Sequence, residues 1–244
     1  MGAPFVFAAM GTVISLHSAR PVPRATQDAV LTAFATLEDR FSLWRPDTEA
    51  ARFARGELAL PETTEAFRQV YDEAVTWRLA TGGAFTPHRP DGVVDLSGIV
   101  KAIALRDAGA VLRAEGLTDW CLNAGGDVVA SGHRASGEPW VVGIVDPLDR
   151  SQLFTEFQMG PERWAVATSG TAERGEHVWR LGADDTFVQV TVCARDIVTA
   201  DVLATAILAG GPEALARAQE LDDIDVLACS AGERVWASAV FLAA

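Results

Sequence analysis

The apolar residues of this chain change their spacing about halfway along, and that change constrains the fold more than any other feature of the sequence. Ile99, Ile103 and Val111 recur at helical spacing and predict a helix over 97–115. The pattern over 118–145 is that of strands. Helices and strands therefore follow one another in unequal runs, which favours an α+β architecture over a repeated strand–helix–strand unit.

Similar patterns cover the rest of the chain, which we expect to form one domain over residues 1–244. The stretch "FVFAAMGTVISLHS" predicts a strand interrupted at Met10, Gly11 and Thr12, because glycine permits a bulge or the close approach of a ligand. Other helices are expected at 24–40, 62–80, 198–209 and 212–221, with a short one after Pro46. Other strands are expected at 164–193, 224–230 and 234–243, with a short one that ends at Asp95. The predicted fold is an α+β sandwich with helices packed on a mixed sheet.

The charge balance argues against nucleic acid as a partner. The chain has 33 Asp and Glu against 20 Lys and Arg, a formal net charge of −13, so a phosphate backbone would be repelled. Its N-terminus lacks the basic start of a signal peptide, and no apolar run approaches the roughly 20 residues that a membrane span needs. We therefore expect a cytoplasmic protein that inserts into no membrane.

Asp201 and Thr205 stand four residues apart in "TADVLATAILAG", so they share one face of a predicted helix. A carboxylate and a hydroxyl, completed by a backbone carbonyl, substrate phosphates and water, form the hard oxygen environment that Mg²⁺ prefers. The alternative is structural: Thr199, Ala200 or Asp201 could cap the start of the helix.

A second set of polar residues lies between residues 95 and 132. Lys101 follows Asp95 near a helix start, where the helix dipole and the ammonium would both favour an anion. The glycines of "NAGGD", residues 123–127, would let backbone N–H groups face a phosphate. Together they predict a phosphorylated ligand. The alternatives are a solvated surface lysine and a plain turn between two strands.

Three further features are weaker when taken singly. Trp44 lies in an expected loop, where its ring could stack on a flat ligand or anchor the rim of the core. His177 follows a polar turn and could act as a general base or be a satisfied edge-strand residue. The segment "ATSG", residues 167–170, could place a hydroxyl and a tight turn beside a phosphate.

The order of these motifs resembles that of the ApbE family of flavin transferases over nearly the whole chain. The motifs are "MGT" (10–12), "FSLWRPDTE" (41–49), "GGAFTP" (82–87), "DLSGIVKAIALRDAGAVLRAEG" (95–116), "NAGGD" (123–127), "ATSG" (167–170), "EHVW" (176–179) and "ADVLATAILAGG" (200–211). The resemblance implies a T-fold-like sandwich and a Mg²⁺-dependent enzyme. Such an enzyme moves FMN from FAD to a threonine or serine hydroxyl of an acceptor protein and releases AMP.

The resemblance also implies a role for individual residues of this chain. The metal would be held by the carbonyl of Gly98 and the side chains of Asp201 and Thr205, and His177 would be the base that prepares the acceptor hydroxyl. The residues expected to contact FAD are Met10, Trp44, Ala84, Phe85, Thr86, Asp95, Lys101 and Val178.

Several positions depart from the family pattern. Thr86 stands where the family has an aspartate, Ala54 where it has an asparagine, and Ala102 where a glycine usually follows the lysine. The segment "HVWRLG" lacks the Asp-Pro that normally follows the histidine. Two other functions therefore stay open: a flavin-binding protein without transferase activity, and an FAD pyrophosphatase that produces FMN and AMP.

Overall fold

The structure is a computed structural model that describes residues 3–170, 187–232 and 234–242. Its strands and helices follow the unequal order expected from the apolar patterns. The strands are β1 (Phe5–Ala9), β2 (Thr12–Ser18), β3 (Trp120–Ala124), β4 (Asp127–Ser131), β5 (Val141–Val145), β6 (Leu153–Gln158), β7 (Ala165–Gly170), β8 (Phe187–Ala194), β9 (Asp225–Ser230) and β10 (Val235–Ala237). The helices are α1 (Arg24–Phe41), α2 (Glu49–Ala54), the 3₁₀ turn η1 (Leu60–Glu62), α3 (Glu65–Ala80), α4 (Ser97–Ala114), α6 (Ile197–Leu221) and α7 (Ala239–Leu242).

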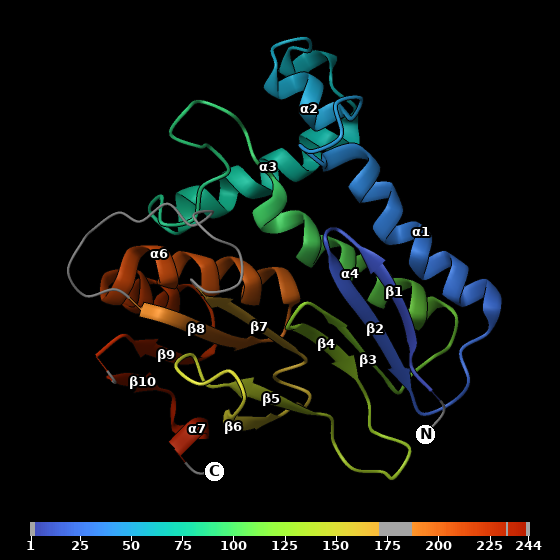
Figure 1. Ribbon diagram of the computed structural model, residues 1–244, viewed down its shortest axis with the longest axis vertical. Helices are drawn as coiled ribbons and strands as arrows, with labels where there is room; N and C mark the ends of the chain where they lie inside the picture. The colour runs from blue at the N-terminus through green and yellow to red at the C-terminus, as the bar shows by residue number, and fades with distance from the viewer. Residues whose placement is uncertain (1–2, 171–186, 233, 243–244) are drawn as a thin grey trace.

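Eight strands form one sheet in the order β1-β2-β3-β4-β7-β8-β9-β10, and β5 pairs with β6 in a separate sheet. Helices α4 and α6 lie on one face of the large sheet, and the small sheet lies on the other with α7 (Figure 1). The predicted α+β class is confirmed. The expected mixture of strand directions is not found, because each strand pair in the described residues is antiparallel, and tight hairpins join β1 to β2 and β3 to β4.

The large sheet has a hydrophobic core on each face. Side chains alternate along a strand, so Val129 and Ala167 join the core beneath the helices, while Val128 and Val166 join the core beneath the small sheet. Strand β8 is buried on both faces along almost its whole length, which explains why most of its residues are apolar, whereas in β7 only Ala165, Val166 and Ala167 are buried.

Helix α6 is the central helix of the protein. Asp196 caps it, accepting hydrogen bonds from the backbone N–H groups of Val198 and Thr199 at 2.9 and 3.2 Å. It spans both predicted helices, and the break between them is a kink at Gly211, whose φ of 64° is not helical, followed by Pro212. Among the described residues, α6 alone is long and apolar enough to cross a membrane, and 72% of its apolar window is buried inside the protein.

Two predicted strand segments differ in the structure, and one strand was not predicted. The segment before Asp95 makes only a single bridge, between His88 and Val94. At the C-terminal end, pairing with β9 stops at Ser238, and the following residues form α7 instead of continuing the strand. The reason is local: the backbone N–H of Phe241 donates to the carbonyl of Ser238, which starts a helical turn. Strand β6 was not predicted.

The interruption at Met10 is a hairpin turn between β1 and β2 rather than a bulge. Met10 and Gly11 both have positive φ, 51° and 71°, as a two-residue hairpin turn requires. The neighbouring hairpin between β3 and β4 turns through Gly125 and Gly126. The two turns touch, because a Cβ on Gly125 would lie 2.5 Å from Oγ1 of Thr12.

This contact predicts different tolerances at two adjacent glycines. Both have positive φ, so alanine is strained at either position, but only at Gly125 does it also meet a neighbouring side chain. We expect Gly125→Ala to lower the free energy of unfolding by about 1–3 kcal/mol more than Gly126→Ala does. Urea denaturation of both variants measures the difference, and equal losses would contradict the packing of the two turns.

Candidate active site

A buried ion pair joins the helix layer to the sheet. Lys101 lies in the second turn of α4 and its ammonium contacts Oδ2 of Asp127, the first residue of β4. The side chains are only 9% and 1% exposed. Oδ1 of Asp127 accepts a hydrogen bond from the backbone N–H of Thr168 in β7, at 3.3 Å. Lys101 is therefore not a solvated surface lysine, and the aspartate of the glycine turn is its partner.

Helix α6 supplies further polar side chains, which are those of Asp201 and Thr205. Asp201 is buried, with 7% of its surface exposed, and lies in the second turn of α6. Because Asp196 caps this helix, the alternative that Asp201 is a cap is wrong. One turn further, the hydroxyl of Thr205 shares a hydrogen bond of 3.1 Å with the hydroxyl of Ser169 in β7. The predicted hydroxyl of "ATSG" is thus present, but it lies on a strand and not in a tight turn.

The segment between α3 and α4 brings small and aromatic residues against both helices. Gly82 and Gly83 end α3 with positive φ, and the hydroxyl of Thr81 accepts a hydrogen bond from the backbone N–H of Phe85 at 3.1 Å. Ala84 packs against α6: a Cβ placed on Gly210 of that helix would lie 3.2 Å from the Cβ of Ala84. The turn is therefore fixed in place by the helix it contacts.

Phe85 continues this contact to α4. Its ring would lie 3.4 Å from a Cβ on Gly98, which stands in the first turn of α4. These contacts close a circle that links α4, the large sheet, α6 and the segment between α3 and α4. In order, the contacts are Lys101 with Asp127, Asp127 with Thr168, Ser169 with Thr205, Gly210 with Ala84, and Phe85 with Gly98.

The remaining predicted residues lie outside this circle of contacts. Oδ1 of Asp95 accepts a hydrogen bond from the backbone N–H of Ser97 at 2.9 Å, so it supports the start of α4. The hydroxyl of Thr86 accepts one from the backbone N–H of His88 at 3.1 Å. Met10 lies in the hairpin turn that touches Gly125. His177 and Val178 lie outside the described residues, so the structure gives no account of them.

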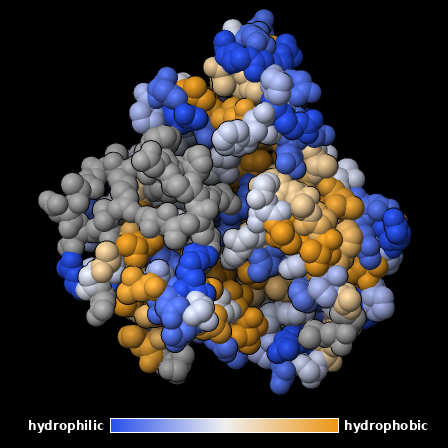
Figure 2. All heavy atoms as spheres, in the orientation of Figure 1, coloured by the Kyte–Doolittle hydropathy of each residue, from blue (hydrophilic) through white to orange (hydrophobic). Residues whose placement is uncertain are grey.

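Trp44 is 89% exposed and follows the end of α1. It therefore does not anchor the core, and its indole face is open to solvent. Figure 2 shows apolar atoms over the hairpin β1–β2 as well, where Val6 and Val13 are exposed. A single exposed tryptophan needs no partner to be stable, but its ring is free to stack on a planar molecule.

The polar groups that α6 and β7 bring together fit a hard divalent cation better than a soft one. No group of three or more His, Cys, Asp or Glu in the described residues could hold a metal by itself. Asp201 offers one carboxylate, and the hydroxyls of Thr205 and Ser169 offer neutral oxygen. Such a sparse oxygen set is what Mg²⁺ uses when substrate phosphates and water complete its shell.

The Lys101–Asp127 pair predicts a strong coupling in stability. Removing one partner leaves the other charge buried without compensation, which typically costs about 3–5 kcal/mol. We expect Lys101→Met to lower the free energy of unfolding by that amount, and Lys101→Met with Asp127→Leu to lose less than the sum of the two single changes. Urea denaturation in a double-mutant cycle measures the coupling. Strictly additive losses would contradict a direct pair.

Curated relatives match part of this chain. A protein of Vibrio cholerae named FAD:protein FMN transferase is 26% identical over 175 residues, which are 66% of this chain and 52% of that protein. A protein of Klebsiella pneumoniae with the same name is 28% identical over 167 residues, 62% of this chain and 47% of that protein. The chain spans about half the length of the curated relatives it matches.

Solved structures share the fold over almost the whole chain. The ApbE protein of Thermotoga maritima superposes with a TM-score of 0.80 at 21% identity, covering 99% of this chain and 98% of that one. The flavin transferase ApbE of Vibrio cholerae gives a TM-score of 0.80 at 22% identity with the same coverage. The sequence model of the ApbE family matches residues 10–89 and 86–228. These matches cover most of the chain, and it belongs to the ApbE family.

Proposed function

We propose that this protein transfers the FMN part of FAD to a threonine or serine hydroxyl of an acceptor protein, with Mg²⁺ bound, and releases AMP. The observation that carries the proposal is that Thr205 on α6 and Lys101 on α4 belong to one circle of contacts, with the buried Asp201 one helical turn before Thr205. The relatives named FAD:protein FMN transferase support it.

The residues of α6 would bind the metal. Asp201 supplies a carboxylate, Thr205 a hydroxyl and Gly98 a backbone carbonyl from the facing helix, and each is an oxygen of the kind Mg²⁺ takes. When bound, the metal neutralises phosphate oxygens and fixes their orientation. The hydrogen bond between Thr205 and Ser169 holds the threonine hydroxyl in place beforehand.

Lys101 would face the phosphates from the other side. Its ammonium is held by Asp127, so its position is fixed, and only part of its charge remains for a ligand. An immobilised donor suits phosphoryl transfer, because that reaction depends on positioning and charge neutralisation more than on covalent help from the protein.

The transfer step balances without an additional reactant. The oxygen of the acceptor hydroxyl forms a bond to the phosphorus of the FMN phosphate, the bond from that phosphorus to the bridging oxygen breaks, and AMP leaves with that oxygen. The hydroxyl proton passes to a base. The family resemblance assigns this role to His177, and the assignment remains part of the proposal.

The flavin would lie beyond the phosphates, against apolar and aromatic residues. Phe85 is buried beside Gly98, and Trp44 offers an exposed ring. The resemblance adds Met10, Ala84, Thr86 and Val178 to this set. The left-handed backbone of Met10 is uncommon for a residue other than glycine, and such conformations concentrate at functional sites.

One observation favours a second candidate function, flavin binding or FAD hydrolysis without transfer. The hydroxyl of Thr86 is used in a local hydrogen bond with His88, so this position provides no carboxylate to the site. Incubation with FAD, Mg²⁺ and candidate acceptor proteins, followed by mass spectrometry, separates the candidates. An acceptor heavier by FMN indicates transfer, free FMN with AMP indicates hydrolysis, and unchanged FAD that stays bound indicates a binding protein.

Asp201→Asn should abolish Mg²⁺-dependent turnover of FAD while leaving the protein folded. The amide keeps the size of the side chain but removes the charge that attracts the cation, so we expect a loss of at least about 100-fold in rate. The matched control is Asp196→Asn on the same helix, because asparagine caps a helix as well as aspartate does. Turnover measured as AMP release against Mg²⁺ concentration tests both. An unchanged rate in Asp201→Asn would remove this residue from the metal site.

Trp44→Ala should weaken FAD binding without destabilising the protein. The side chain is 89% exposed and contributes little packing, whereas stacking on a planar ring is typically worth about 1–3 kcal/mol, or roughly tenfold or more in affinity. Leu79→Ala is the control, because Leu79 is 67% exposed and lies on α3. Titration of FAD fluorescence measures affinity. If both variants bind FAD as the wild type does, Trp44 does not contact the flavin.

A further inference from the structure

A separate cleft opens between α1, α3 and α4. Its volume is about 550 Å³, within the range of roughly 300–1,000 Å³ typical of small-molecule sites. Helix α1 packs along α4, while α3 diverges from both (Figure 1). Some of the side chains that line it are small and leave part of the space unfilled; these include Ala29 and Ala33 on α1 and Ala66 on α3.

This cleft is distinct from the candidate active site. It is lined by Ile103, Arg106 and Asp107 of α4, whereas Gly98 and Lys101 mark the face that looks toward α6 and the sheet. At 100° per residue the two sets lie on opposite sides of the helix. A ligand in the cleft would therefore not touch the residues assigned to FAD.

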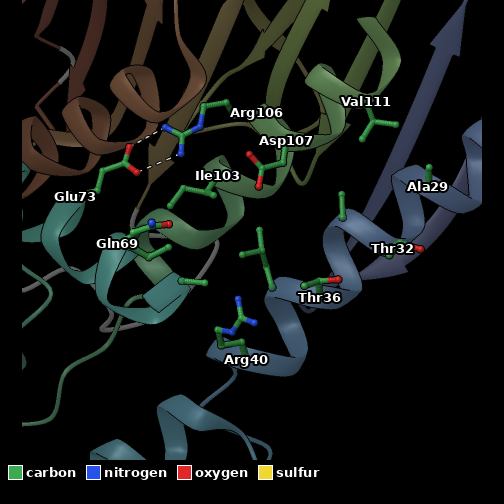
Figure 3. A pocket seen from close by; sticks show the side chains of 14 residues that line it. Ala29, Thr32, Thr36, Arg40, Gln69, Glu73, Ile103, Arg106, Asp107 and Val111 are labelled. Atoms are coloured by element: carbon green, nitrogen blue, oxygen red, sulfur yellow. Dashed lines mark hydrogen bonds and ion pairs between the residues drawn. The ribbon is translucent and has the colours of Figure 1, made fainter. Parts of the chain in front are cut away.

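The charges around the cleft are paired, with one exception. Arg106 makes a bidentate contact with Glu73, with N···O distances of 2.8 and 3.2 Å, and Nε of Arg40 lies 3.5 Å from Glu49. Asp107 has no hydrogen bond or ion pair within the described ranges of the chain. Figure 3 shows its carboxylate directed into the space between the helices, beside Ile103.

The carboxylate of Asp107 favours a cation at its own end of the cleft. Asp107 lies exposed at the mouth, yet nearby groups displace enough water to raise the pKa of its carboxyl above the ordinary value. Arg106 offsets part of the charge of Asp107, and a bound cation would compensate the rest. The walls beside it are aliphatic, with Val70, Ile103 and Val111 available to cover methylene groups.

We propose that this cleft binds a small aliphatic ammonium or guanidinium ion, with Asp107 as its counter-ion and the side chains of α1, α3 and α4 around its alkyl chain. The proposal rests on the cavity and on the carboxylate of Asp107, which has no hydrogen bond or ion pair among the described residues, and it does not depend on the flavin transfer reaction. Arg106 and Glu73, which bind each other, form one wall of the cleft, so the carboxylate of Asp107 stays available to the ligand.

The test uses n-pentylammonium as the probe and n-pentanol as its neutral counterpart. Protein ¹H–¹⁵N shifts are followed during titration of the full chain, and saturable changes are expected at backbone amides of α1, α3 and α4 with the ammonium only. Asp107→Asn should weaken binding about tenfold or more, because a charge-assisted hydrogen bond is lost. Asp72→Asn, at an exposed position on the outer face of α3, makes the same charge change outside the cleft and should leave the affinity unchanged.

A second variant distinguishes binding inside the cleft from attraction of the cation to the acidic surface. Ala66→Leu fills the cleft from α3 with a residue that favours helices, so it should abolish binding while the protein remains folded. Binding that survives Ala66→Leu, or that falls equally in Asp107→Asn and Asp72→Asn, would overturn the proposal. So would the absence of saturable binding to the wild type, or equal binding of n-pentanol.

Discussion

The ion pair between Lys101 and Asp127 is the interaction on which the arrangement of the site depends. It is the polar link between α4 and the large sheet, and both of its side chains are almost completely removed from solvent. A buried pair of this kind contributes little net stability compared with apolar packing, and it costs stability when one partner is lost. What it provides here is position: the ammonium cannot move away from the end of the glycine hairpin.

The other contacts follow from the geometry of the sheet next to that pair. The side chain of Asp127 accepts a hydrogen bond from the backbone N–H of Thr168, which helps to fix the register of β7 against β4. Alternation along β7 then sends the hydroxyl of Thr168 to Thr191, 2.9 Å away, and turns Ser169 toward α6. The threonine on α6 therefore meets a hydroxyl from the sheet, and Asp201 lies one turn before it on the same helix.

The sequence predicted the fold class, most helices and the helix face that carries Asp201 and Thr205, because these depend on local spacing. It did not predict that Lys101 is buried, since its partner is 26 positions away. The two side chains meet only because α4 packs against the sheet beside β4. Residue type alone could not separate a cap from a site residue at the start of α6; that required seeing Asp196 bonded to the first turn. Strand β6 was missed because its alternation is weak, with exposed apolar side chains at Leu153 and Phe154.

The proposed transfer requires a metal bound with substrate phosphates beside Asp201 and Thr205 of α6. Crystals of the protein soaked with FAD and Mn²⁺, which replaces Mg²⁺ and scatters anomalously, would locate the ion directly. We expect an anomalous peak at bonding distance from a carboxylate oxygen of Asp201 and the hydroxyl of Thr205, with phosphate oxygens completing the shell. A peak elsewhere, or ordered FAD with no ion and with Thr205 still bonded only to Ser169, would contradict it.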